Sequence, residues 1–151
     1  MKYRYELINK NNFIYNELYF FLKKVDNDLP IPISKKIELD TFLNKIFNLG
    51  QVYCAFDKNK LIGTCFFYCN DERQDLAFLT LLVIDDKYRR KGIGNRLVGL
   101  MIKYCQMLGF KKLRLYTRVN NVQAIKFYKS IGFYEVKSDR IGDIMFELKL
   151  G

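Results

Sequence analysis

The 151-residue chain contains no histidine, no tryptophan and only two prolines. Without histidine it lacks the usual Cys/His zinc arrangements, and it has no histidine to act as the general base of a triad. Four cysteines are present, and none forms a CxxC pair. Three of them, Cys54, Cys65 and Cys69, lie in apolar, strand-like runs, where buried reduced thiols are ordinary. We therefore predict no metal site.

Long apolar runs are also missing. No stretch of 18 or more apolar residues occurs, which argues against a membrane span. The first residues lack the apolar run of a secretory signal. We expect a cytoplasmic protein with no membrane partner, and a length of 151 residues predicts one domain over residues 1–151.

Acidic residues are outnumbered by basic ones, and the formal net charge is +10. Such a balance favours an anionic partner, which could be nucleic acid, anionic lipid or a phosphorylated small molecule. The cations are scattered along the chain and do not form one arm or tail. Charge alone therefore does not choose among these partners.

Hydrophobic periodicity and turn residues predict strands and helices along the whole chain, which alternate only in its second half. Ser34 is the expected N-cap of the second helix, and Gly50 is expected to end it. The predicted order, β-α-α-β-β-β-α-β-α-β-β, indicates a mixed α/β (α+β) sheet. The expected strands cover residues 3–8, 51–56, 60–69, 76–84, 113–117, 133–136 and 144–150, and the expected helices cover residues 11–24, 34–49, 92–108 and 122–131.

The segment YRRKGIGNRLVGL, residues 88–100, combines three consecutive cations with two glycines, directly before a predicted helix. The first N–H groups of a helix have no partner within it and carry the positive end of the helix dipole. Gly92 and Gly94 allow a sharp turn and a close approach of a ligand. This combination predicts a binding site for phosphate or pyrophosphate.

Two common phosphate motifs do not fit this segment. A Walker loop requires Lys followed by Ser or Thr after the second glycine, but Asn95 and Arg96 follow Gly94. The dinucleotide motif requires a small residue where Leu97 stands, and an acidic residue about twenty positions further on, where none is found near Tyr116.

The remaining pattern, Arg89-x-x-Gly92-x-Gly94, resembles the phosphate loop of the GCN5-related N-acetyltransferases (the GNAT superfamily). The resemblance extends downstream through a strand to Asn121-x-x-Ala124-x-x-x-Tyr128 and then to Gly132-Phe133. The upstream order of elements fits as well. The similarity covers the chain, most firmly residues 76–133, and implies the GNAT acyltransferase fold.

The resemblance implies that acetyl-CoA binds where the apolar strand splays from its neighbour at a bulge. The strand backbone near Leu82 and Ile84 is expected to pair with the pantetheine arm, and Asn121 to touch the same arm while capping its helix. Tyr128 matches the position that protonates the leaving thiolate. The pyrophosphate is expected on the loop, which comprises Arg89, Arg90, Lys91, Gly92, Ile93, Gly94 and Asn95.

A general base is not evident from the sequence. Many GNAT members carry a glutamate on the strand before the loop, where this chain has Leu76, Phe78 and Thr80. Asp75, Glu72 or water remain as proton acceptors, and we favour water.

The family's substrate site corresponds here to residues 20–36 and 68–71. Tyr68 and Asn70 are expected to point polar groups toward it. Residues 29–34 form either a wall of that site or a loop packed on the core.

Together these features predict an N-acetyltransferase that moves an acetyl group from acetyl-CoA to a primary amine of a small metabolite by direct attack. An amino sugar or a polyamine-like compound is one such acceptor. Two alternatives stay open: acetylation of a protein N-terminus or lysine, and a non-catalytic module that binds CoA. We expect no nucleic-acid partner, and a monomer or homodimer.

Overall fold

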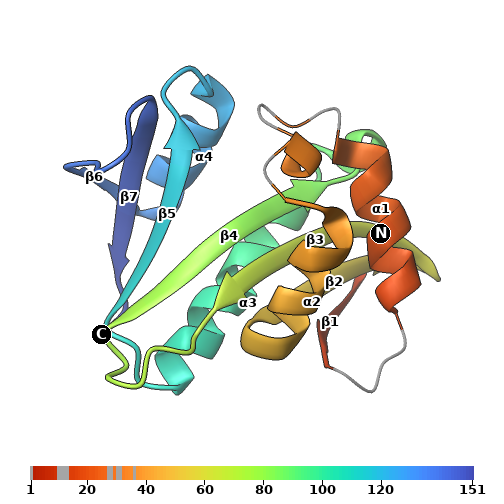
Figure 1. Cartoon of the computed structure of the whole chain (residues 1–151), viewed down its shortest axis with the longest axis horizontal. Coiled ribbons are helices and arrows are strands. Elements are labelled where there is room, and N and C mark those ends of the chain that lie inside the picture. The colour runs from red at the N-terminus through yellow and green to blue at the C-terminus, as the bar shows by residue number, and fades with distance from the viewer. Residues whose placement is uncertain (1, 10–13, 27–28, 30–31, 36) are drawn as a thin grey trace.

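The computed structural model describes residues 2–9, 14–26, 29, 32–35 and 37–151. In this part of the chain, seven strands form one mixed sheet in the order β1-β2-β3-β4-β5-β7-β6. Apart from the short helices η2 and η3, helices and strands follow one another in the predicted order (Figure 1). They are β1 (Arg4–Ile8), α1 (Tyr15–Val25), η2 (Ile33–Lys35), α2 (Leu39–Leu49), β2 (Gln51–Asp57), β3 (Lys60–Tyr68), β4 (Leu76–Ile84), η3 (Asp86–Tyr88), α3 (Ile93–Met107), β5 (Lys112–Arg118), α4 (Val122–Ile131), β6 (Tyr134–Val136) and β7 (Asp143–Lys149).

The mixed α/β fold class and element order are confirmed, and one helix start is wrong. Ser34 does not cap α2 but lies within the short helix η2, and its hydroxyl donates to Asp26. Helix α2 begins five residues later, after Glu38, whose side chain makes no capping bond. The hydroxyl of Ser34 binds the buried carboxylate of Asp26 and is therefore not available to cap α2. The predicted start of the first helix, residues 11–13, lies outside the described residues.

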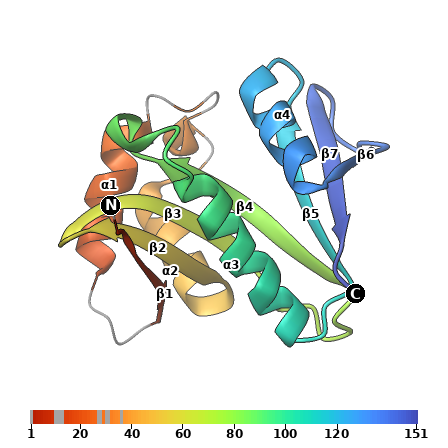
Figure 2. The ribbon, with the colours of Figure 1, turned by 180° about the vertical axis from the view of Figure 1, so that it is seen from behind.

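Two apolar clusters sandwich the sheet. Helices α3 and α4 cover one face through residues such as Leu97, Met101 and Tyr128. Helices α1 and α2 cover the other face, over β2 and β3, through residues such as Leu22 and Leu43. Figures 1 and 2 show that none of the described helices covers the second face where β5, β7 and β6 lie. Among the described helices, none is both long and apolar enough to cross a bilayer.

Strands β4 and β5 pair only at their beginning. Residues Leu76, Ala77 and Phe78 lie beside Lys112, Leu113 and Arg114 in a parallel ladder, and beyond these residues the strands diverge (Figure 1). Near the same point the register of β4 against β3 shifts, so that Phe66 lies opposite Leu81 and Phe67 opposite Leu79. Thr80 is the extra residue of this bulge. A bulge bends a strand and increases its twist, which accounts for the divergence.

Candidate functional site

The glycine loop, residues 89–95, connects β4 to α3. It lies at the open end of the splay, the region where β4 and β5 diverge. Gly92, at the N-cap of α3, has φ of 80°, and Arg90 has φ of 63° although it carries a side chain. Arg90 and Gly92 both have a left-handed backbone conformation, and one residue separates them. This arrangement points successive N–H groups toward the same side, where they can form a concave anion site. The free N–H groups of the first turn of α3 add to it. The predicted phosphate cradle thus has a defined backbone geometry.

Buried and aromatic contacts hold the segment that leads into this loop. The carboxylate of Asp85 is almost fully buried, and it accepts hydrogen bonds from Lys24 Nζ at 2.9 Å and from the Lys87 N–H at 2.9 Å. The hydroxyl of Tyr88 donates to Asp57 Oδ2 at 2.7 Å. These contacts tie the segment before the glycine loop to α1 and to the β2–β3 hairpin.

The three cations of the loop have different roles. Arg89 forms an exposed ion pair with Asp86 at 2.8 Å, so its side chain already has a partner. Arg90 and Lys91 are exposed. Asn95 is also exposed, whereas Ile93 is buried under the first turn of α3. The backbone of the loop and the exposed cations Arg90 and Lys91 are therefore the groups that can meet an anion here.

The backbone of Leu82 and Ile84 points into the splay. The Asp85 N–H donates to Ile62 O on β3. Because backbone groups alternate in direction along a strand, Val83 also points to β3, whereas Leu82 and Ile84 point to the opposite edge. That edge has no strand partner beyond Phe78. It is therefore free to pair with an extended ligand, and its pairing with a pantetheine arm stays a prediction.

Tyr128 and Asn121 lie on the far side of the splay, on α4. The ring of Tyr128 is buried between Phe127 and Phe133, with centroids 5.1 and 5.6 Å away. Burial raises the pKa of the Tyr128 hydroxyl, and the nearby Cys65 raises it further. The hydroxyl therefore stays protonated. Asn121 Oδ1 accepts from the Ala124 N–H at 3.2 Å. Asn121 is therefore the N-cap of α4, as predicted.

Helix α4 approaches the glycine loop across the splay. A Cβ added to Gly94 would lie 3.4 Å from the ring of Phe127 and 3.9 Å from Leu82. The two sides of the splay therefore meet at Gly94, where an added methyl group would make ordinary van der Waals contact with Phe127 and Leu82.

The predicted substrate residues lie where β3 ends and the β3–β4 connection begins. Tyr68 is half-buried at the end of β3, opposite Phe78, with Lys45 Nζ 5.9 Å from its ring centroid. Asn70 is exposed in the β3–β4 connection, at the end of β4 away from the glycine loop. Glu72 is exposed in the same connection, and Asp75 pairs with Lys111 at 3.1 Å. The connection therefore offers no carboxylate to the splay.

The connection between α1 and α2 is packed on the core where it is described. Ile33 is buried in the cluster beneath α1 and α2, and its N–H donates to Asp26 Oδ1 at 2.6 Å. Asp26 is itself buried. Of the two alternatives for this segment, packing against the core holds for Ile33, and residues 27–28, 30–31 and 36 lie outside the described residues.

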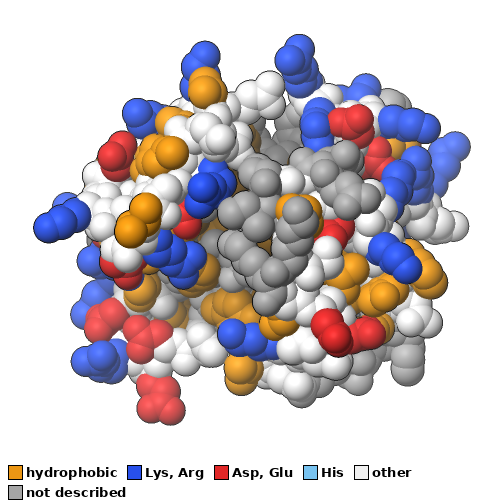
Figure 3. All heavy atoms as spheres, turned by 45° about the horizontal axis from the view of Figure 1, so that its top comes forward, with side chains coloured by type: hydrophobic (Ala, Val, Ile, Leu, Met, Phe, Trp, Pro, Cys, Tyr) orange, Lys and Arg blue, Asp and Glu red, His pale blue; other side chains and the backbone are white. Residues whose placement is uncertain are grey.

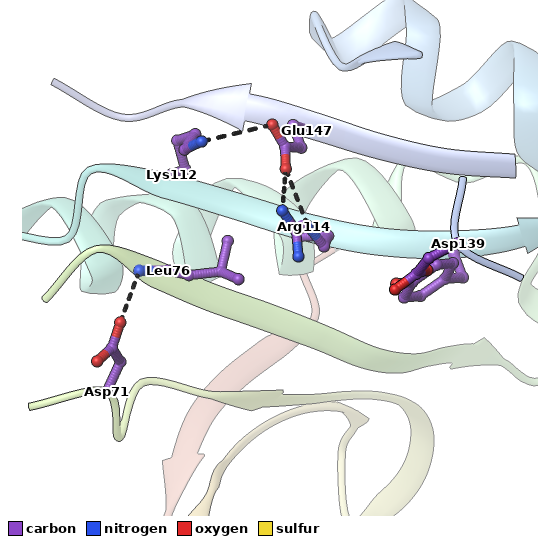
Figure 4. Close-up of polar contacts among 7 residues, drawn as sticks. Asp71, Leu76, Lys112, Arg114, Asp139 and Glu147 are labelled. Atoms are coloured by element: carbon purple, nitrogen blue, oxygen red, sulfur yellow. Dashed lines mark hydrogen bonds and ion pairs between the residues drawn. The ribbon is translucent and has the colours of Figure 1, made fainter. Parts of the chain in front are cut away.

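The uncovered face of β5 and β7 carries polar groups that the sequence analysis missed. Glu147 is 6% exposed and accepts from Arg114 Nε at 2.8 Å and Nη2 at 2.6 Å, with Lys112 Nζ 3.7 Å away (Figure 4). Tyr116 donates to Asp139 Oδ1 at 2.6 Å, and the Arg140 guanidinium lies 3.7 Å from the Tyr116 ring centroid. The polar alternation of KLRLYTR in β5 was the available signal, but it does not identify the partners.

Positive charge is spread widely around the molecule. Figure 3 shows Lys and Arg side chains around the edge of the visible face, with acidic side chains between them. No single basic patch dominates this view, which agrees with the scattered cations of the sequence.

Comparisons with known proteins agree with this geometry. The model of the acetyltransferase (GNAT) family matches residues 12–133. An N-alpha-acetyltransferase MAK3 from Arabidopsis thaliana is 29% identical over 124 residues, covering 81% of this chain and 63% of that protein. The N-alpha-acetyltransferase 30 of Xenopus laevis is 39% identical over 90 residues, covering 59% of this chain and 29% of that protein. The chain thus spans less than two thirds of the length of these relatives.

A chain of a solved complex is also similar to this chain in its fold. The crystal structure of the NatC complex bound to Gag peptide and CoA contains a chain that is similar to this one with a TM-score of 0.78 and 25% identity, covering 100% of both chains. Because the family model matches most of the sequence, and the loop and splay have the geometry described above, the chain belongs to the GNAT acetyltransferase family.

Proposed function

We propose that this protein transfers an acetyl group from acetyl-CoA to the α-amine at the N-terminus of a protein or peptide. The observation that carries this choice is the absence of a free base. The chain has no histidine, β4 has no carboxylate, and two described carboxylates of the uncovered face, Glu147 and Asp139, already accept hydrogen bonds. The acceptor must therefore arrive largely neutral.

The basicity of the acceptor then distinguishes the substrate classes. An α-amine has a pKa of about 7.7–8.0, so roughly a third of it is neutral at pH 7.5. A lysine amine with a pKa of about 10.4 is neutral in only about one molecule in a thousand. The relatives named N-alpha-acetyltransferases, and the similar NatC chain bound to a peptide, point to the same class.

The residues divide the reaction between the two sides of the splay. Acetyl-CoA supplies the thioester carbon that the amine attacks. The loop amides from Arg90 to Asn95 hold its pyrophosphate, and the backbone edge at Leu82 and Ile84 pairs with its pantetheine arm. Tyr128 donates a proton to the departing thiolate, since its raised pKa keeps the hydroxyl protonated. The uncovered face of β5 and β7 receives the acceptor, because the opposite face is filled by α3 and α4.

A thiol-release assay with acetyl-CoA tests the proposal. The panel contains peptides with a free α-amine, the same peptides with a blocked α-amine and a free lysine, a polyamine and an amino sugar. We expect release only with free α-amines, and mass spectrometry should place the acetyl group there. Turnover confined to the polyamine or amino sugar would instead support a small-metabolite acceptor. Binding of acetyl-CoA without any turnover would indicate a non-catalytic module.

A further inference from the structure

Two cysteine side chains meet outside the candidate site. Cys69 Sγ and Cys105 Sγ lie 2.9 Å apart, although 36 residues separate them along the chain. Cys69 directly follows β3, and Cys105 lies in the last turn of α3. The sequence analysis assigned Cys69 to a buried strand run, but it is partly exposed and lies outside the strand. Nothing in the proposed acetyl transfer uses this pair.

We propose that Cys69 and Cys105 are an oxidisable dithiol that forms an intramolecular disulfide. A disulfide bond is about 2.05 Å long, so closing it requires the sulfurs to move together by less than roughly 1 Å. A metal site is the other common use of adjacent thiols. Among the described residues no group of three or more Cys, Asp or Glu side chains is placed to hold a metal ion, so the pair lacks the further ligands that such a site needs.

The difference in exposure between the two thiols gives the order of the exchange. A small disulfide such as glutathione disulfide can reach Cys69, whereas Cys105 is fully buried. The Cys69 thiolate attacks one glutathione sulfur, forming a mixed disulfide and releasing one glutathione thiolate. Cys105, after losing its proton to solvent, attacks the Cys69 sulfur and releases the second glutathione. Overall, two protein thiols are oxidised to one disulfide and one glutathione disulfide is reduced to two thiols.

The bond would join the β3–β4 connection to the last part of α3. Two contacts already hold this region: Gln74 Nε2 donates to Leu108 O at 2.8 Å, and the Lys111 N–H donates to Gln74 O at 3.1 Å. Because Cys105 is 13 residues beyond Gly92 along α3, about 20 Å separates the pair from the glycine loop. We therefore expect oxidation to stabilise the fold without closing the candidate site. The proposal does not depend on acetyl transfer.

The test uses the purified chain equilibrated at a series of ratios of reduced to oxidised glutathione. Acid quenching, unfolding and alkylation with iodoacetamide are followed by intact mass measurement and peptide mapping. At oxidising ratios we expect two of the four cysteines to escape alkylation, a mass lower by two hydrogens before alkylation, and a cross-linked pair of peptides containing Cys69 and Cys105. The melting temperature should rise by roughly 5–15 °C.

Variants make the assignment specific. Cys69→Ser and Cys105→Ala should both abolish the cross-link and the rise in melting temperature. Cys54→Ala removes a thiol from the other apolar cluster and serves as the matched control that keeps the cross-link. The proposal is overturned if all four wild-type thiols stay alkylatable at the most oxidising ratio, if the link maps to another pair, or if the reaction stops with glutathione on Cys69.

Discussion

The two sides of the splay between β4 and β5 are built in different ways. On the loop side, the anion site comes from consecutive residues, with left-handed backbone at Arg90 and Gly92 directly before α3. On the uncovered face, each polar pair joins distant segments, as Arg114 with Glu147 and Tyr116 with Asp139. The comparison suggests that cofactor binding depends on local backbone geometry, whereas acceptor binding depends on tertiary contacts.

The largest expected effect comes from the loop side. Gly94→Asp places a carboxylate at the N-terminus of α3, where the pyrophosphate is expected, while an acidic residue there is favourable for the helix itself. We expect acetyl-CoA affinity to fall by about 100-fold or more, equivalent to about 2.7 kcal/mol, with an unchanged circular dichroism spectrum. Isothermal titration calorimetry measures the affinity.

Gly94→Ala is the matched control for that change. Its methyl group lies 3.4 Å from the Phe127 ring, and the substitution adds no charge to the loop. We expect it to bind acetyl-CoA within a few-fold of the wild type. If the wild type and Gly94→Asp bind acetyl-CoA with equal affinity, the pyrophosphate does not bind at this loop.

The next effect separates turnover from binding. Tyr128→Phe keeps the ring packed against Phe127 and Phe133 and deletes only the hydroxyl. Turnover should fall by about 10²–10⁴-fold, the range for general acid catalysis, with little change in acetyl-CoA affinity. Tyr104→Phe, an aromatic of the same cluster, is the control and should keep its activity. Turnover of Tyr128→Phe within a factor of two of wild type would mean that another group protonates the thiolate.

The pH dependence of kcat/KM tests the absence of an enzyme base. With two peptides whose α-amine pKa values differ by about one unit, the rise of kcat/KM with pH should follow each peptide's own pKa, because the neutral amine is the reactive form. If a base on the free enzyme accepts the proton, kcat/KM should rise over the same pH range for both peptides. If that shared rise disappears in Asp75→Asn, Glu72→Gln or Asp139→Asn, the variant identifies the base.

A smaller effect concerns the anchor of the loop. Burial raises the pKa of Asp85, but the hydrogen bonds from Lys24 and the Lys87 N–H outweigh it and leave the pKa below the ordinary 3.8. A carboxyl with a lowered pKa in the folded state stabilises the fold above its unfolded pKa and loses that contribution as pH falls. Lys24→Met should therefore lower the free energy of unfolding by about 1–3 kcal/mol at pH 7.

Urea unfolding at pH 7 and pH 3 checks this prediction. The difference between Lys24→Met and wild type should shrink at pH 3, because Asp85 loses the charge that pairs with Lys24 as pH falls. Lys23→Met removes the neighbouring lysine, which forms no ion pair with Asp85, and serves as the control. A difference that is independent of pH would show that the lysine acts through packing of its alkyl chain.

Most of the fold could be predicted from the sequence because its signals are local. The apolar run Leu76–Ile84 and the helix Val122–Ile131 have the predicted bounds. Asn121 caps α4 because a short polar side chain at that position can accept an N–H of the first turn. Ser34 shows the limit of this reasoning, since the buried carboxylate of Asp26 competes for its hydroxyl.

The glycine loop could be predicted from its own short segment, because charge, glycine and helix start all lie within six residues and act through the backbone. The rest of the site depends on contacts between distant segments. Strand register places Arg114 opposite Glu147, the bulge at Thr80 directs Leu82 and Ile84 into the splay, and packing of α3 on β3 brings Cys105 to Cys69. These contacts depend on which strands pair and how they twist, which no short stretch of residues specifies.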